Sequence, residues 1–275
     1  MRKEGYTHTG KKENEDIFGI TESSVFVLDG ASALLDTNFT PNGNDVVWMV
    51  KWWKNYLLDH LDDLTVSIQD IMKNGIEQIN KDFSKYQPID KLSKLELVSA
   101  GIGIMRMHDE FFEIFVLGDV EISVLQENNV DIYTDERIKP LDQSVIDLMA
   151  TNENRLNECV FKGFTEAELE LLKINRNKMN TDEGYYILST DEKAVDNSIY
   201  KKISKTSQVK CMIASDGLSL LDKYYTREKL ISEVAKRGVQ SLIEELRAYE
   251  NEDKDKVKMK RLKTHDDATG VFVEW

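Results

Sequence analysis

The chain has 275 residues, of which 41% are hydrophobic and 31% are charged, and its formal net charge is −14 at pH 7. The apolar share is enough for a buried core, and the length fits one large domain or two small ones. A chain this acidic, with no extended basic face, is not expected to bind nucleic acid or an acidic membrane surface.

The cysteines and the N-terminal residues indicate the type of site and the cellular compartment to expect. Cys159 and Cys211 lie far apart and lack the neighbours of a zinc site or a disulfide framework. Cys211 sits in an apolar run, which predicts a core thiol. The first residues are polar, and no run approaches the length of a membrane-spanning helix. We therefore expect a cytoplasmic protein.

Apolar patterning in the first half of the chain predicts strands, then two helices, then further strands. A helix should begin at Asn44 or Asp45, either of which can cap it, and a second should span residues 66–83. Gly118-Asp119 is expected to be a turn within an antiparallel meander. Gly101 and Gly103 lack the third glycine of a dinucleotide loop, so a strand is favoured there. The expected strands cover residues 17–20, 25–28, 98–104, 111–117 and 120–125.

Residues 135–184 have a different character, because asparagines are frequent and only residues 166–173 show a firm helical pattern. A segment of this length is not expected to be a bare loop, so we predict a small subdomain or a lid. Residues 250–263 are charged and are interpreted as a solvated linker. The remaining expected elements are strands at 185–189, 199–203, 209–215 and 269–275, and helices at 227–237 and 240–249.

Four acidic clusters adjoin apolar, strand-like runs. Carboxylates at strand ends can converge at one edge of a sheet, where oxygen ligands suit hard cations such as Mg²⁺ or Mn²⁺. Each cluster alone is a common turn or a solvated acidic pair, but their combination favours a metal site. The clusters are Asn14-Glu15-Asp16, Asp29-Gly30, Asp216-Gly217 and Asp266-Asp267.

These clusters belong to a longer series of motifs that resembles, in the same order, those of the metal-dependent protein phosphatases of type 2C. The series is Asn14-Glu15-Asp16, Val27-Leu28-Asp29-Gly30, Leu117-Gly118-Asp119, Ala214-Ser215-Asp216-Gly217 and Asp266-Asp267-Ala268-Thr269. The resemblance, from about Gly10 to Trp275, implies an α+β fold. This fold is a four-layer α-β-β-α sandwich of two antiparallel sheets flanked by helices. It also implies a single catalytic domain over residues 1–275, with a flap at about 135–184.

The resemblance further implies a phosphatase acting on phosphoserine and phosphothreonine in proteins, in a system with a serine/threonine kinase. Two Mn²⁺ or Mg²⁺ ions would bind a bridging water, whose hydroxide is the nucleophile. Asp29, Asp216 and Lys11 are the implied catalytic residues. The implied metal ligands are Asp29 for both ions, Glu15 and the Gly30 carbonyl for one, Asp216 and Asp266 for the other, Asp16 through water, and Asp119 for a doubtful third ion.

Several residues depart from the family pattern. Lys11 stands where the family usually carries a phosphate-binding arginine, and it is either a point-charge substitute or a solvated lysine. Ala31-Ser32-Ala33 replaces a frequent His-Gly-Gly, so the leaving group would be protonated by water or by another group. His265 is a candidate for that role, although an incidental exposed histidine is favoured. Leu220 replaces an acidic residue of the third metal site.

Two alternatives stay open. The altered Lys11 and Leu220 positions are compatible with a catalytically impaired pseudophosphatase that acts as a regulatory binding module, although the retained carboxylates argue against it. A metal-dependent phosphatase of small phosphorylated molecules is the other alternative, and the flap would decide between these substrate classes.

Overall fold

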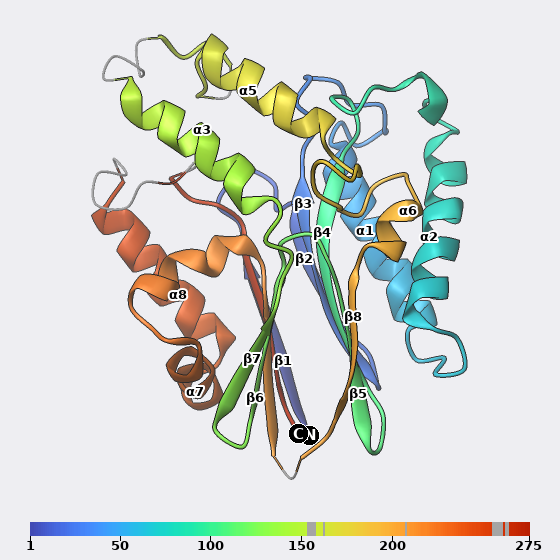
Figure 1. Cartoon of the computed structure of the whole chain (residues 1–275), viewed down its shortest axis with the longest axis vertical. Helices are drawn as coiled ribbons and strands as arrows, with labels where there is room; N and C mark the ends of the chain where they lie inside the picture. Colours follow the sequence, from blue (N-terminus) through green and yellow to red (C-terminus); the bar gives the residue numbers. More distant parts are fainter. Residues whose placement is uncertain (153–157, 162, 207, 255–260, 262–263) are drawn as a thin grey trace.

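Two five-stranded antiparallel sheets, packed face to face, form the centre of the computed structural model (Figure 1). The structure describes residues 1–152, 158–161, 163–206, 208–254, 261 and 264–275. In sheet order, the first sheet contains β1 (Arg2–His8), β10 (Ala268–Glu274), β9 (Val209–Ala214), β6 (Glu121–Gln126) and β7 (Asn129–Tyr133). The second contains β2 (Asp16–Ile20), β3 (Ser24–Ala31), β4 (Ser99–Met107), β5 (Phe111–Leu117) and β8 (Ile199–Ser204).

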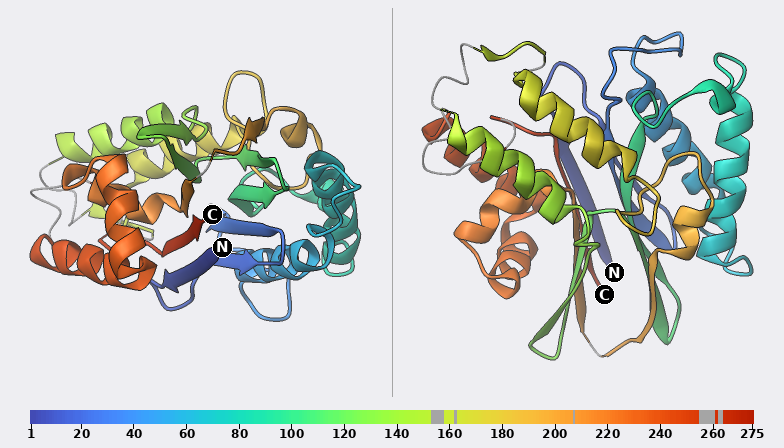
Figure 2. Two further views of the ribbon diagram at one scale, coloured as in Figure 1. Left: turned by 90° about the horizontal axis from the view of Figure 1, so that it is seen from below. Right: turned by 45° about the horizontal axis from the view of Figure 1, so that its top comes forward.

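Helices cover both outer faces, which confirms the four-layer α-β-β-α sandwich. The second sheet is covered by α1 (Asp45–His60), α2 (Ile68–Phe83) and the short α6 (Lys193–Asp196), and the first by α7 (Arg227–Arg237) and α8 (Val239–Glu252). The view from below shows both sheets between these helical layers (Figure 2). Two helices, α3 (Lys139–Thr151) and α5 (Glu166–Asn177), lie across the end opposite the chain termini (Figure 1). Short 3₁₀ helices are η1 (Ile89–Lys91) and η2 (Asp216–Lys223).

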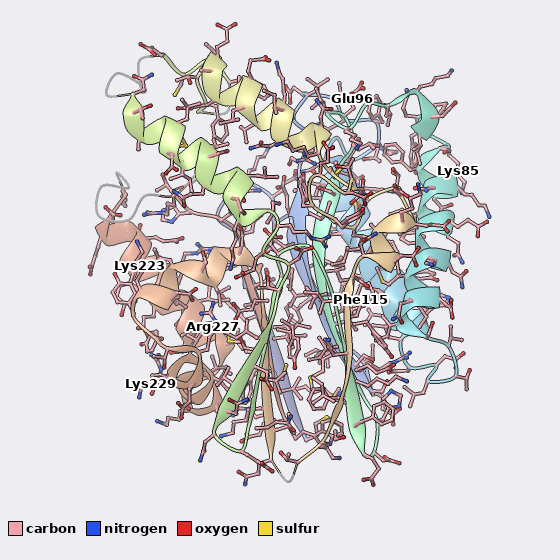
Figure 3. The ribbon with its side chains drawn as sticks, in the orientation of Figure 1. Lys85, Glu96, Phe115, Lys223, Arg227 and Lys229 are labelled. Carbon is pink, nitrogen blue, oxygen red and sulfur yellow. The ribbon has the colours of Figure 1, made fainter. Side chains whose placement is uncertain are left out.

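The core has three apolar layers because most strands are buried on both faces. On β3, Val25 and Val27 point between the sheets, whereas Phe26 and Leu28 pack toward α1 and α2. A third layer joins the first sheet to η2, α7 and α8. Side chains fill these layers, while Lys85 and Lys229 lie on opposite outer sides (Figure 3). Cys211 is a buried free thiol in the core, as predicted, and Cys159 is also free.

The helix starts follow from capping side chains. The Asn44 side chain accepts a hydrogen bond from the Val47 amide and begins α1, and Ser67 caps α2 in the same way. Thr226 caps α7, whose bounds agree with the predicted helix. No helix in the described part of the chain is long and apolar enough to cross a membrane.

The predicted meander is wrong at Gly118-Asp119. β4 and β5 do pair, but β6 belongs to the other sheet and pairs with β7 and β9. Gly118 has a φ of 87°, a conformation that favours glycine, and the chain crosses there from one sheet to the other. Apolar alternation identifies strands but not their partners, so the pattern could not show this crossing.

Other differences lie in polar segments. The sequence did not predict β1, β7 or α3, and the expected strand at 185–189 forms only isolated bridges, such as Ala100 to Leu188. The expected linker at 250–263 begins too early, because α8 continues to Glu252; residues 255–260 and 262–263 lie outside the described residues. β1 and β7 are edge strands, which need little apolar patterning, and Pro140 at the start of α3 was the missed helix signal.

A buried ion pair ties the second sheet to the α1–α2 connection. The Arg106 guanidinium lies 2.7 Å from Glu113 and donates to the Val66 carbonyl at 2.9 Å. Burial alone would raise the pKa of Glu113, but hydrogen bonds from Arg106, Tyr200 and His108 outweigh it and lower this pKa to about 2. The pair therefore stabilises the fold above pH ~4.5, and this contribution is lost as the pH falls toward 2.

We expect Arg106→Met to lower the free energy of unfolding by about 3–5 kcal/mol, because it leaves the Glu113 carboxylate buried without a counter-charge. Urea denaturation at pH 7 measures this loss. Arg237→Met is the control, since Arg237 pairs with Glu233 and Glu245 at the surface, and it should cost less than ~1 kcal/mol. Equal losses would contradict the burial argument.

Candidate metal and phosphate site

A cleft of about 710 Å³ lies at the end of the sandwich covered by α3 and α5. Segments that are far apart in the sequence converge on it: the start of β2, the end of β3, the β5–β6 crossing, the start of η2 and the residues before β10. Five of the predicted acidic residues line it, namely Glu15, Asp29, Asp119, Asp216 and Asp266.

Strand pairing places Asp29 at the centre of this group. Asp29 stands opposite Asp16 on β2 and opposite Gly101 on β4. The Asp216 amide, the first of η2, donates to Asp29 Oδ2 at 3.2 Å. The acidic motifs of both sheets therefore meet at Asp29.

Gly101 leaves the space that Asp119 needs. A Cβ at this position would lie 3.0 Å from Asp119 Oδ1 and 3.2 Å from Val120. Gly101 lies within β4, so the predicted strand is confirmed and a dinucleotide loop is excluded. Its missing side chain lets the Asp119 carboxylate approach the strand opposite Asp29.

The carboxylates disturb one another electrostatically. Burial, and then the nearby Asp16, Asp216, Asp119 and Asp266, raise the pKa of Asp29 well above its ordinary value. Burial, followed by Asp267 and Asp216, raises the pKa of Asp16 to about 7. Burial and Asp216 raise that of Asp119 to about 7 as well. These charges are close enough to repel one another.

Asp266 and Asp267 have different surroundings. Asp267 is only 3% exposed, and its carboxylate accepts hydrogen bonds from the Gly10 amide at 2.8 Å and the Glu15 amide at 2.9 Å. Asp266 lines the cleft, and its Oδ1 accepts the Asp267 amide at 2.9 Å. Asp267 thus holds the Glu15 segment in place, which leaves Asp266 as the cleft-facing carboxylate.

Lys11 contacts carboxylates. Its Nζ forms an ion pair with Glu15 and lies 3.5 Å from Asp267 Oδ2. Glu15 Oε1 also accepts a hydrogen bond from Ser32 Oγ at 2.5 Å. The positive charge of Lys11 is therefore shared with two acidic side chains of the same site.

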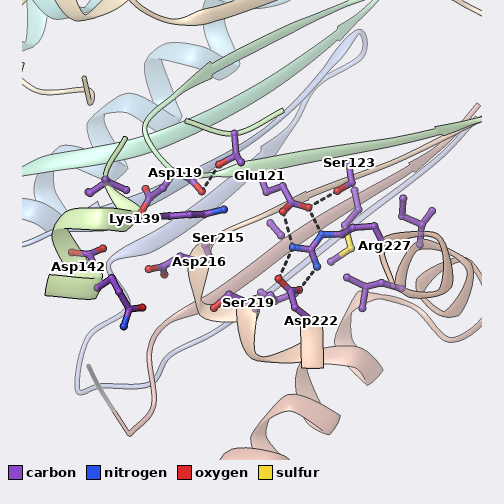
Figure 4. A pocket seen from close by; sticks show the side chains of 18 of the residues that line it. Asp119, Glu121, Ser123, Lys139, Asp142, Ser215, Asp216, Ser219, Asp222 and Arg227 are labelled. Carbon is purple, nitrogen blue, oxygen red and sulfur yellow. Dashed lines mark hydrogen bonds and ion pairs between the residues drawn. The ribbon is translucent and has the colours of Figure 1, made fainter. Parts of the chain in front are cut away.

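A second pocket of about 310 Å³ adjoins the cleft and shares Asp119, Asp142 and Asp216 with it (Figure 4). At its far side, Arg227 bridges Glu121 and Asp222. Asp222 is thus engaged in an ion pair, and the half-buried Leu220 packs against the apolar layer beneath α7 and α8.

His265 lies at the edge of the cleft, where its Nδ1 is 2.9 Å from Glu250 Oε2. Glu250 also pairs with Arg247, whose guanidinium donates to the Asp266 carbonyl at 2.7 Å. These contacts tie His265 to α8 and position the chain that enters β10.

The donor set fits a hard divalent cation. Five carboxylates and the Gly30 carbonyl offer oxygen ligands only. Asp16 Oδ2 is buried and has no hydrogen-bond partner among the described residues, and a bound cation or its water would supply one. Within the described ranges, however, no group of three or more His, Cys, Asp or Glu side chains is already arranged to hold a metal ion, so the ligand set stays a prediction.

The sequence analysis assigned no role to three residues of the site. Asp142 was missed because α3 was not predicted, and Asp267 was named only as part of an acidic cluster, without a role of its own. Arg176, near the end of α5, lines the cleft and donates to the Ser32 carbonyl at 2.9 Å. Its position in an asparagine-rich segment carried no recognisable signal.

Comparison with solved structures identifies the fold. The serine/threonine phosphatase PstP/Ppp of Mycobacterium tuberculosis matches with a TM-score of 0.60 and 13% identity, over 98% of this chain and 97% of that one. The PstP catalytic domain in complex with two manganese ions matches with a TM-score of 0.58 and 14% identity, over 98% and 96% of the chains. Stp1 of Staphylococcus aureus matches with a TM-score of 0.57 and 12% identity, over 98% and 93%.

The sequence-based comparisons gave nothing further: no protein-family model and no curated protein matches the chain. The structural matches show that the chain has the fold of bacterial type 2C serine/threonine phosphatases over nearly its whole length. The resemblance predicted from the ordered motifs is thus confirmed for the fold.

In a chelator, Asp29→Asn should raise the free energy of unfolding by about 1 kcal/mol, because it removes one of several mutually repelling carboxylates. Thermal melts in EDTA measure the change. Mn²⁺ should then stabilise the variant much less than the wild type.

Asp62→Asn is the matched control. Burial alone would raise the pKa of Asp62, but hydrogen bonds from Ser23, Thr21 and Glu22 outweigh it and lower this pKa to about 2, so the same substitution should destabilise. A loss of stability in both variants would show that repulsion does not act at Asp29.

Proposed function

We propose that the chain is a metal-dependent protein phosphatase acting on phosphoserine and phosphothreonine. The observation that carries the proposal is the convergence of Glu15, Asp29, Asp119, Asp216 and Asp266 on one cleft. Support comes from the shared fold with bacterial serine/threonine phosphatases, one of them in complex with two manganese ions.

In this proposal Asp29 would be shared by two Mn²⁺ or Mg²⁺ ions. Glu15 and the Gly30 carbonyl would hold one of them, and Asp216 and Asp266 the other. Bound there, the ions would lower the pKa of a water toward neutrality and screen the negative charge of the phosphate. Asp16, behind Asp29, would accept hydrogen bonds from water in the metal shell.

Hydrogen bonds within the protein also hold the proposed metal ligands in position. The Asp216 amide fixes one oxygen of Asp29, and Asp267 holds the Glu15 segment through two backbone amides. These bonds fix the carboxylates before substrate arrives, which is how a preorganised site reduces the cost of positioning.

Residues 135–184 would act as a flap within one catalytic domain. The helices α3 and α5 cover the end of the sandwich that holds the cleft, and they contribute Asp142, Asn175 and Arg176 to its lining. A phosphorylated protein would contact these helices, and a serine/threonine kinase would supply that substrate.

A pseudophosphatase is the second candidate, favoured by the ion pairs of Lys11 with Glu15 and Asp267. A lysine held in this way resembles an internal counter-charge that substitutes for a cation. Hydrolysis assays separate the two candidates.

Mn²⁺ or Mg²⁺ should switch on hydrolysis of an aryl phosphate and of a phosphothreonine peptide, because activation of water near neutral pH needs the metal. Rates are compared with metal and with EDTA, after folding has been checked by circular dichroism. A folded, metal-loaded protein that cleaves neither substrate would favour the pseudophosphatase. Activity on the aryl phosphate and other small esters alone would favour a small-molecule phosphatase.

Asp119→Ala should reduce the rate much less than Asp29→Ala, by ~10-fold against ~10³-fold or more, or about 1.4 against 4 kcal/mol. Asp29 would serve two ions, whereas Asp119 would serve at most a weakly held third. Turnover is measured at saturating Mn²⁺, with thermal melts as the folding control. Equal losses would place Asp119 in the essential core.

A further inference from the structure

Arg176 forms no salt bridge with an acidic side chain among the described residues, although the charge of Asp142 favours its protonated form. Its Nη2 donates to the Ser32 carbonyl at 2.9 Å, and its Nη1 donates to Ser99 Oγ at 3.1 Å and points to the Leu97 carbonyl at 3.5 Å. All of these acceptors are neutral. A guanidinium has five N–H donors, and Nε has no acceptor in the described part of the chain.

Other shielded arginines of the protein are compensated. Arg106 meets Glu113, Arg227 meets Glu121 and Asp222, and Arg247 meets Glu250. Burial lowers the pKa of Arg176, which reflects the cost of keeping its charge away from water. Asp142 offsets part of this cost through its charge, but the hydrogen bonds of Arg176 go to neutral atoms, so the guanidinium still favours an anion that enters the cleft.

Arg176 is also close to the proposed catalytic centre. It lines the cleft that contains Asp29 and Asp216. Its contact Ser99 pairs with Ala31, which is two residues along β3 from Asp29. Two residues of a strand span about 7 Å, so the strand position that Arg176 contacts lies near Asp29 along the sheet, and no ion pair joins Arg176 to a cleft carboxylate among the described residues.

We propose that Arg176 binds the phosphate group of the substrate through its guanidinium, a role that rests on the proposed phosphatase function. Lys11, the phosphate-binding candidate of the sequence analysis, is held by Glu15 and Asp267. The planar fork of an arginine matches phosphate oxygens in pairs, which a lysine cannot do. The phosphate site would then be divided between the sheets, which carry the acidic residues, and α5, which carries the cation.

The test measures binding of inorganic phosphate to the full-length, Mg²⁺-loaded protein by isothermal titration calorimetry. Arg176→Met keeps much of the side-chain length but removes the charge, and we expect phosphate binding to weaken ~10- to 100-fold. Arg176→Lys should give an intermediate loss. Arg137→Met is the matched control, because Arg137 lies in the same segment but pairs with Asp135, and its binding should stay within ~2-fold of wild type.

An unchanged phosphate affinity in Arg176→Met would show that Arg176 only ties α5 to the sheets, and a wild type that binds no phosphate would also overturn the proposal. If thermal melts show that Arg176→Met does not fold, the Arg176→Lys variant decides. A phosphate affinity equal to that of the wild type in Arg176→Lys would reject the paired contact between the guanidinium and the phosphate oxygens. For active protein, KM for aryl phosphate should rise in parallel with the phosphate Kd.

The binding measurement does not require turnover, so the two proposals can fail separately. Arg176-dependent phosphate binding in a protein that cleaves nothing would retain this site and reject the phosphatase. Full hydrolysis together with phosphate binding that does not depend on Arg176 would retain the phosphatase and reject the role of Arg176.

Discussion

Repulsion among carboxylates is the constraint on which the rest of this structure depends. Asp16, Asp29 and Asp119 are close to other acids and are partly or wholly shielded from water, and both effects raise the pKa of each. Such an arrangement lowers the stability of the fold, and clusters of this kind are typical of functional sites. Divalent cations are the ligands that would offset it, since oxygen donors of this kind suit them.

Strand pairing and backbone contacts set the positions of these acids in the sandwich. Pairing of β2, β3 and β4 sets the positions of Asp16 and Asp29, and the missing side chain of Gly101 makes room for Asp119. Backbone amides then fix individual oxygens, as the Asp216 amide does for Asp29. Three buried apolar layers stabilise the frame and offset the electrostatic cost.

Two positively charged side chains of the cleft, Lys11 and Arg176, have different surroundings. Lys11 forms ion pairs with carboxylates, whereas Arg176, which reaches the cleft from α5, donates hydrogen bonds to neutral oxygens and interacts with Asp142 only through its charge. An anion that enters the cleft would meet acids on the sheets and a positive charge on α5. Movement of α5 would then change both access to the cleft and affinity for phosphate.

The sequence by itself determined most strands and helices, the four-layer class and five acidic residues of the cleft, namely Glu15, Asp29, Asp119, Asp216 and Asp266. It could do so because apolar periodicity and capping are local, and because the motifs keep a fixed order. Only the tertiary structure decided that β5 and β6 belong to different sheets, that Lys11 pairs with Glu15 and Asp267, and that Arg176 donates its hydrogen bonds to neutral oxygens beside the cleft. These features depend on contacts between residues far apart in the chain, which no local pattern records.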